Sequence, residues 1–164
     1  LRQPGKDVIW LPTPDALVSR MLRAAKTTRD DIVYDLGAGD GRIPIAAAKD
    51  FGASAVGIEY DGQLAALARR NAERAGVAER VTILQGDIFK EDFSRATVVT
   101  LYLLPDLNQQ LRPRLLGMRP GTRVVVAADL TLPTESIERR TAAQWRSADT
   151  ARYAKRPAIF ILEA

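Results

Sequence analysis

The stretch Asp35-Leu-Gly-Ala-Gly-Asp-Gly-Arg42 decides the fold that we expect for this chain. A short β-branched run at 31–36 leads into it, and an Ala-rich segment at 43–51 follows and predicts a helix. Alternating glycines permit a tight turn with positive φ and let a ligand approach the backbone. The N-terminus of the following helix offers free N–H groups to that ligand. A strand, a glycine-rich turn and a helix in this order predict a nucleotide-type site at the carboxyl edge of a sheet.

The alternation of strands and helices continues along the chain. Thr13-Pro14-Asp15 predicts a helix start with Thr13 as the N-cap, and apolar residues at helical spacing follow as far as Ala25. Later helices are predicted at about 62–75 and 106–116, and Pro113 should bend or split the second. The other predicted strands lie at 55–60, 81–85, 96–103, 123–128 and 158–162, with a weaker one near 142–146.

These elements predict an α/β fold, a Rossmann-like and mostly parallel sheet with helices on both faces. The apolar run Val124-Val125-Val126 fits a strand that is covered from both sides. A chain of 164 residues has the length of one domain. We therefore expect residues 1–164 to form a single domain, with its sheet core at 31–164.

The composition excludes several kinds of chemistry. The chain has no cysteine and no histidine, which excludes thiol nucleophiles, zinc–thiolate sites, histidine-ligated metals and the Ser-His-Asp triad. We expect no bound metal. The apolar runs are far shorter than the ~20 residues of a membrane span, so we expect none. A net charge of +4 permits acidic or nucleic-acid partners without favouring them.

The residues around the glycines indicate which ligand fits. In the dinucleotide fingerprint G-x-G-x-x-G, the third glycine would fall at position 42, where this chain has Arg42. Asp35 and Asp40 flank the turn, and two carboxylates there would repel a pyrophosphate but suit a ligand with positive charge. S-adenosylmethionine (SAM) carries a sulfonium and an ammonium group. The electrostatics therefore favour SAM over NAD.

Two later strands end in acids that fit the same ligand. Glu59 can accept hydrogen bonds from ribose hydroxyls, Asp87 can accept one from an adenine amino group, and Ile88 can pack on the ring. The alternatives are a solvated acid at Glu59 and a simple Gly-Asp turn at Asp87. From the glycine loop onward, the predicted cofactor-binding residues are Asp35, Gly37, Ala38, Gly39, Asp40, Glu59, Tyr60, Asp87 and Ile88.

These successive motifs resemble those of class I SAM-dependent methyltransferases. A closer resemblance, to the small protein-lysine methyltransferases of archaea and their mitochondrial relatives, adds Trp10-Leu-Pro-Thr-Pro14, Thr100-Leu-Tyr-Leu-Leu-Pro105 and Pro120-Gly-Thr-Arg123. It implies SAM as cofactor and seven strands with the last antiparallel. It also implies that residues 1–26 form an N-terminal helix and a cofactor lid segment, with Pro12 and Thr13 near SAM.

The resemblance predicts methyl transfer from SAM to lysine side chains of a protein. Tyr102, at the end of the fourth strand, is the candidate catalytic residue because its hydroxyl can point at the incoming amine; packing at the strand end is the alternative. The family's Ser-His-acid-Phe type stretch is replaced here by Val126-Ala-Ala-Asp129, which alters the acceptor end. Asp129 can attract a basic target or simply face a loop.

Other functions stay open at this point. They are methylation of RNA or of a small molecule, SAM binding without catalysis and, disfavoured by Arg42, a dinucleotide oxidoreductase. An arginine cluster at positions 69, 70, 74 and 80 can touch RNA, but no aromatic residues interleave with it as base stacking requires. SAM is an intracellular cofactor, so we expect the cytoplasm, and a leader removed upstream of Leu1 stays open. No oligomeric state is predicted.

Overall fold

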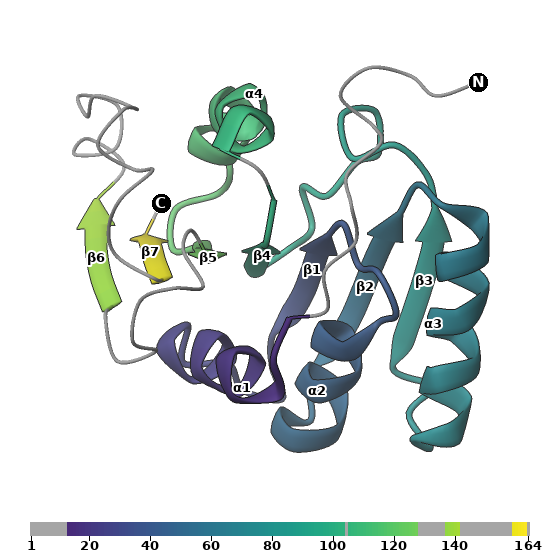
Figure 1. Cartoon of the computed structure of the whole chain (residues 1–164). Coiled ribbons are helices and arrows are strands. Elements are labelled where there is room, and N and C mark those ends of the chain that lie inside the picture. The colour runs from purple at the N-terminus through teal and green to yellow at the C-terminus, as the bar shows by residue number, and fades with distance from the viewer. Residues whose placement is uncertain (1–12, 104, 128–136, 142–158, 164) are drawn as a thin grey trace.

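The computed structural model describes residues 13–103, 105–127, 137–141 and 159–163. Helices and strands alternate through most of this range (Figure 1). The helices are α1 (Asp15–Ala24), α2 (Arg42–Phe51), α3 (Gly62–Arg74) and α4 (Pro105–Leu116). The strands are β1 (Ile32–Leu36), β2 (Ser54–Glu59), β3 (Val81–Gln85), β4 (Val98–Leu101), β5 (Arg123–Ala127), β6 (Ile137–Thr141) and β7 (Ile159–Glu163).

The strands form one sheet in the order β3-β2-β1-β4-β5-β7-β6. The first five strands run parallel, whereas β7 is antiparallel to β5 and parallel to β6. The predicted Rossmann-like architecture, a parallel sheet with helices, is confirmed. Because β1 lies between β2 and β4, the chain reverses its direction across the sheet at β1. Ligands of open α/β sheets bind outside the carboxyl ends of the strands at such a point.

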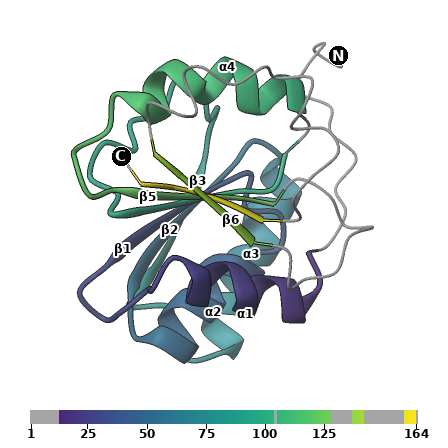
Figure 2. The same ribbon diagram turned by 90° about the vertical axis from the view of Figure 1, so that its left-hand side faces the viewer.

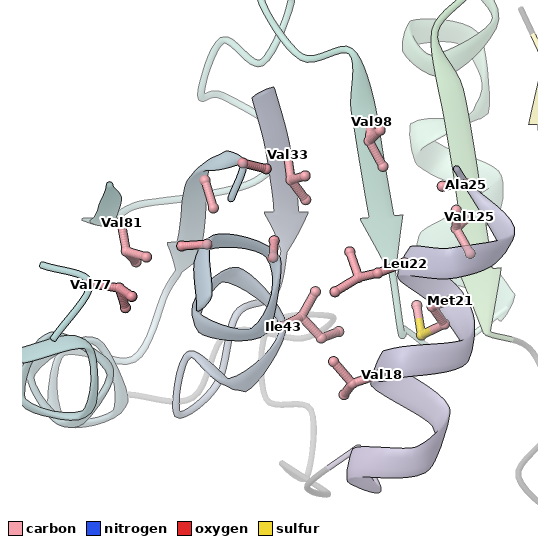
Figure 3. Close-up of a cluster of buried hydrophobic side chains, with 14 of the residues drawn as sticks. Val18, Met21, Leu22, Ala25, Val33, Ile43, Val77, Val81, Val98 and Val125 are labelled. Atoms are coloured by element: carbon pink, nitrogen blue, oxygen red, sulfur yellow. The ribbon is translucent and has the colours of Figure 1, made fainter. Parts of the chain in front are cut away.

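Helices cover both faces of the sheet, with α1, α2 and α3 on one face and α4 on the other (Figure 2). On the first face the apolar stripe predicted for α1 is buried, and Val18, Met21 and Leu22 lie in one cluster with Ile43 of α2 and Val98 and Val125 of the strands (Figure 3). On the second face Leu111 and Leu115, one helical turn apart, are fully buried in a cluster that contains Phe93. No helix in the described ranges is long and apolar enough to cross a bilayer.

The structure corrects the predicted N-cap of α1, excludes one of two alternatives for α4 and adds one strand. The N-cap of α1 is Pro14 rather than Thr13, and no side chain caps that helix. Pro113 does not split α4, which continues past it to Leu116. Strand β6 was not predicted, because Ile-Glu-Arg-Arg-Thr at 137–141 lacks an apolar alternation. The weaker strand predicted near 142–146 lies outside the described residues.

Truncation of Leu111 tests the packing of α4. We expect Leu111→Ala to lower the free energy of unfolding by about 2–5 kcal/mol, because it removes a fully buried side chain and leaves a cavity. Urea unfolding measures this change. The matched control is Gln110→Ala, an exposed position on the same helix, for which we expect less than about 0.5 kcal/mol. Equal effects of the two substitutions would contradict the packing of α4 on the sheet.

Candidate active site

The glycine-rich loop lies at the carboxyl end of β1, at the reversal point of the sheet. The amides of Gly37 and Ala38 both donate to the carbonyl of Ile58 in β2, at 2.9 and 3.0 Å. All three loop glycines have positive φ, with values of 88°, 58° and 85° for Gly37, Gly39 and Gly41. The predicted tight turn is therefore confirmed, and a side chain at these positions would strain the backbone.

Glu59, at the end of β2, holds the loop from the side. Its Oε1 accepts a hydrogen bond from the amide of Gly39 at 2.8 Å, and its Oε2 accepts one from the amide of Asp61 at 2.8 Å. Asp61 in turn caps α3, with its Oδ1 accepting from the amides of Gln63 and Leu64. A carboxylate oxygen has two acceptor positions. Each oxygen of Glu59 therefore keeps capacity for a ligand hydroxyl.

Asp35 is buried in β1, with 2% of its surface exposed. Its Oδ1 accepts a hydrogen bond from the Thr100 hydroxyl at 2.8 Å, and the two residues are register partners across β1 and β4. Burial raises the pKa of Asp35 to about 7, the bond from Thr100 opposes this rise, and the charges of Glu59 and Asp40 add to it. A cationic ligand in the loop would favour the ionised form of this carboxyl.

Asp40 has a different role from Asp35. The Arg42 guanidinium binds the Asp40 carboxylate twice, with Nε 3.1 Å from Oδ1 and Nη2 2.7 Å from Oδ2. Its Nη1 donates to the carbonyl of Thr13 at 2.9 Å, so Arg42 ties the start of α1 to the loop. The two acids looked equivalent in the sequence, but the charge of Asp40 is balanced within the chain. Thr13 is buried here, and Pro12 lies outside the described residues.

The segment after β3 begins beside the loop. The amide of Gly86 donates to the carbonyl of Glu59 at 2.9 Å, which brings Glu59 and Asp87 to neighbouring strand ends. The Asp87 Oδ1 accepts a bond from the amide of Phe89 at 2.9 Å, so the turn expected as an alternative is also present. Ile88 is half-buried against the cluster that contains Phe93, Leu111 and Leu115, and Tyr60 is 48% exposed.

Tyr102 follows β4 and is half-buried against the core beneath α1. Burial raises the pKa of its hydroxyl, which therefore stays protonated at neutral pH. The next residue, Leu103, has its Cδ2 2.9 Å from the place where a Cβ on Gly37 would lie. Leu103 thus lies against the glycine loop, whereas the packing of Tyr102 is that of the strand-end alternative, and its catalytic role stays a prediction. Asp129 lies outside the described residues.

Three residues of this site were not assigned in the sequence analysis to the roles that the structure gives them. Thr100 binds Asp35, Arg42 joins the loop to Thr13, and the Asn71 Nδ2 donates to the carbonyl of Asp40 at 2.9 Å. Thr100 could have been found once β4 was paired in register with β1. The bonds of Arg42 and Asn71 to backbone carbonyls leave no signal in the sequence.

The fold and this site define a class I SAM-dependent methyltransferase. The ANTKMT methyltransferase domain matches residues 35–138, and the chain belongs to that family. It is 51% identical over 120 residues to a protein-lysine N-methyltransferase of Saccharolobus islandicus (strain REY15A), covering 72% of this chain and 74% of the relative. It is 36% identical over 102 residues to the adenine nucleotide translocase lysine N-methyltransferase of Mus musculus, covering 62% of this chain and 44% of that protein.

Solved structures are similar as well. A Salinibacter ruber protein described as an RNA methyltransferase, crystallised with S-adenosyl-L-homocysteine, has a TM-score of 0.70 and 56% identity. The match covers 71% of this chain and 76% of that one. A SAM-dependent methyltransferase of Geobacter sulfurreducens, in complex with the same compound, has a TM-score of 0.63 and 25% identity, covering 72% of this chain and 49% of that one.

The buried carboxyl of Asp35 makes stability depend on pH. In the free protein the folded state holds a proton on Asp35 up to about pH 7, whereas the unfolded chain releases it near the ordinary pKa of 3.8. The free energy of unfolding therefore falls as pH rises between these values, by up to about 1.4 kcal/mol per pH unit. We expect Asp35→Asn to remove this loss, so that the variant gains stability over the parent toward neutral pH.

Urea unfolding of both proteins across this pH interval, without ligand, measures the difference. The matched control is Asp50→Asn, an exposed carboxyl on α2, whose difference from the parent should not change in the same way. Parallel pH profiles for Asp35→Asn and the parent would show that Asp35 titrates normally.

Proposed function

We propose that this protein transfers methyl groups from SAM to lysine side chains of a protein substrate. The observation that carries the proposal is the glycine loop at the reversal point of the sheet, with Glu59 bound to Gly39 and the buried Asp35 just before the loop, at the end of β1. Membership of the methyltransferase family supports the reaction. The lysine acceptor is supported by the relatives from Saccharolobus islandicus and Mus musculus, both named as lysine N-methyltransferases.

The site's donor and acceptor groups fit SAM. We propose that Asp35 balances the cofactor's positive charge, that Glu59 accepts from its ribose hydroxyls, and that Asp87 and Ile88 receive its adenine. The other proposed contacts are with Pro12, Thr13, Gly37, Ala38, Gly39, Asp40 and Tyr60. When bound, SAM supplies a methyl group activated by its sulfonium. Binding and orientation are then the work of the protein.

The protein's own part in the reaction is to position a neutral amine. A free lysine has a pKa near 10.4, and the chain has no histidine to take its proton near neutral pH. An apolar channel lowers an amine's pKa because it disfavours the charged form. We propose that Tyr102, which is half-buried and protonated, orients the amine by a hydrogen bond and does not act as a base.

Methylation of RNA is the second candidate, favoured by the similarity to the Salinibacter ruber protein. The arginine cluster on and after α3 gives it little support. Because β2 and β3 run parallel, α3 descends from the edge that carries Glu59 to the opposite edge. Arg74 and Arg80 therefore lie away from the site, and Arg69 donates to the carbonyl of Ile83 at 2.9 Å.

The proposal extends to the whole chain. We propose one domain over residues 1–164, with the helix and lid segment at 1–26 and the sheet core at 31–164. We also propose seven strands with the last antiparallel, which the pairing of β5 with β7 supports. Because SAM is an intracellular cofactor, we propose a cytoplasmic location.

Labelling tests the acceptor directly. The protein is incubated with SAM tritiated in its methyl group and a cell lysate whose own methyltransferases have been inactivated by heat. We expect label that protease releases and nuclease does not, and that acid hydrolysis yields as methylated lysine. Nuclease-sensitive label would replace the lysine proposal with the RNA alternative. S-adenosylhomocysteine binding without any label would indicate a binding protein without catalysis.

Removal of the Glu59 carboxylate tests the cofactor assignment. We expect Glu59→Ala to weaken binding of S-adenosylhomocysteine by about 1–3 kcal/mol, roughly 5- to 150-fold, because charge-assisted hydrogen bonds to the ribose are lost. Calorimetric titration measures the affinity, and the parent should bind this ligand and not NAD. Glu73→Ala, at an exposed acid on α3, is the control and should bind as the parent does. Unchanged affinity for Glu59→Ala would contradict the assignment of Glu59 to the ribose hydroxyls.

A further inference from the structure

One side chain of α4 holds the segment that follows β3. The Arg114 Nη1 donates to the carbonyl of Ile88 at 2.7 Å, and its Nη2 donates to the carbonyl of Glu91. The two acceptors belong to the same loop, 26 and 23 residues before Arg114 in the chain. A planar guanidinium presents its donors in a fixed fork, which suits two acceptors at once.

The position of this guanidinium is set by the core of the second face. Its central carbon lies over the Phe93 ring, 4.1 Å from the ring centroid. Phe93 is 2% exposed and belongs to the same buried cluster as Leu111 and Leu115 of α4. Arg114 therefore joins the backbone of the loop to the buried side of α4, which covers that face of the sheet (Figure 2).

The same loop is also fixed at its beginning. The amide of Gly86 donates to the carbonyl of Glu59, and the Glu91 side chain fills the place where a Cβ on Gly86 would lie. Asp87 and Ile88 thus lie between an anchor on β2 and an anchor on α4. The first anchor comes from the residue that holds the glycine loop, so Arg114 sets where Ile88 lies relative to Glu59.

We infer that Arg114 is a positioning residue for the adenosine end of the cofactor site, acting through the backbone of the loop 86–91. This inference rests on the proposed function, which assigns adenine to Asp87 and Ile88. In this inference Arg114 acts through its bonds to the carbonyls of Ile88 and Glu91 and not by contact with the ligand. Its loss should therefore weaken every ligand that contains adenosine by a similar factor, whether or not the ligand carries the amino-acid part.

The experiment compares two ligands on three variants. Affinities for S-adenosylhomocysteine and for adenosine are measured by calorimetry for the parent, Arg114→Met, Arg114→Lys and the control Arg119→Met. Arg119 is exposed, just beyond α4, and its Nη2 lies 3.5 Å from the carbonyl of Arg95 rather than from the loop. For Arg114→Met we expect both affinities to fall together by about tenfold or more.

Arg114→Lys should lose less affinity than Arg114→Met, because an ammonium keeps the charge but lacks the planar fork. Arg119→Met should bind both ligands as the parent does. Hydrogen exchange of the amides of Phe89, Lys90 and Glu91 provides a second readout that needs no ligand. These amides bond within the loop, and we expect them to exchange faster in Arg114→Met while the amides of α2 keep their rates.

The outcomes separate this inference from the proposed function. If the parent binds neither ligand, the cofactor assignment fails and the inference fails with it. If the parent binds both and Arg114→Met binds them equally well, only the role of Arg114 is wrong. A fall for S-adenosylhomocysteine without one for adenosine would also overturn it. Should Arg114→Met not fold, Arg114→Lys decides: a fall of both affinities together supports the inference, and unchanged affinities overturn it.

Discussion

The carboxylate of Glu59 is the interaction on which the site depends. One oxygen binds the amide of Gly39 and the other binds the amide of Asp61, so a single side chain joins the glycine loop, the end of β2 and the start of α3. Gly39 has positive φ, a conformation that glycine adopts readily and most other residues do not. A charge-assisted bond from outside the loop stabilises it there. The ligand site is in this way partly formed before a ligand binds, which lowers the entropy cost of binding.

The acids of the site divide between stability and binding. Asp40 is balanced by Arg42, and their pairing also brings the start of α1 against the loop. Asp35 is almost fully buried, accepts a bond from the neutral Thr100 hydroxyl, and has a pKa raised to about 7. A structure selected for stability alone would place an apolar residue there. A cationic ligand would offset the free-energy cost of burying this carboxylate. The destabilising position of Asp35 is in this way linked to the proposed cofactor.

The sequence predicted those features whose signal is local. Helix α3 and strand β3 were predicted almost to the residue, because apolar spacing and flanking glycines mark them. The glycine loop and Glu59 were likewise predicted from spacing. Strand β6 was missed because its charged residues are typical of an edge strand, whose pairing depends on β7. The bonds by which Arg42 holds Thr13 and Arg114 holds Ile88 were not predicted. Their acceptors are backbone carbonyls, which every residue has.

Helix α4 connects the two ends of the proposed site. Near its start, the Asn108 Nδ2 lies 3.5 Å from the carbonyl of Leu103, which covers Gly37 and follows Tyr102. Near its end, Arg114 holds the loop that carries Asp87 and Ile88. The proposed acceptor rim and the proposed adenine loop therefore share one support, packed on the sheet through Leu111 and Leu115. Because this core is close-packed, a shift of α4 would move both together. In the proposed site, one helix would thus position both the acceptor rim and the adenine loop, whereas Glu59 and β2 position the glycine loop.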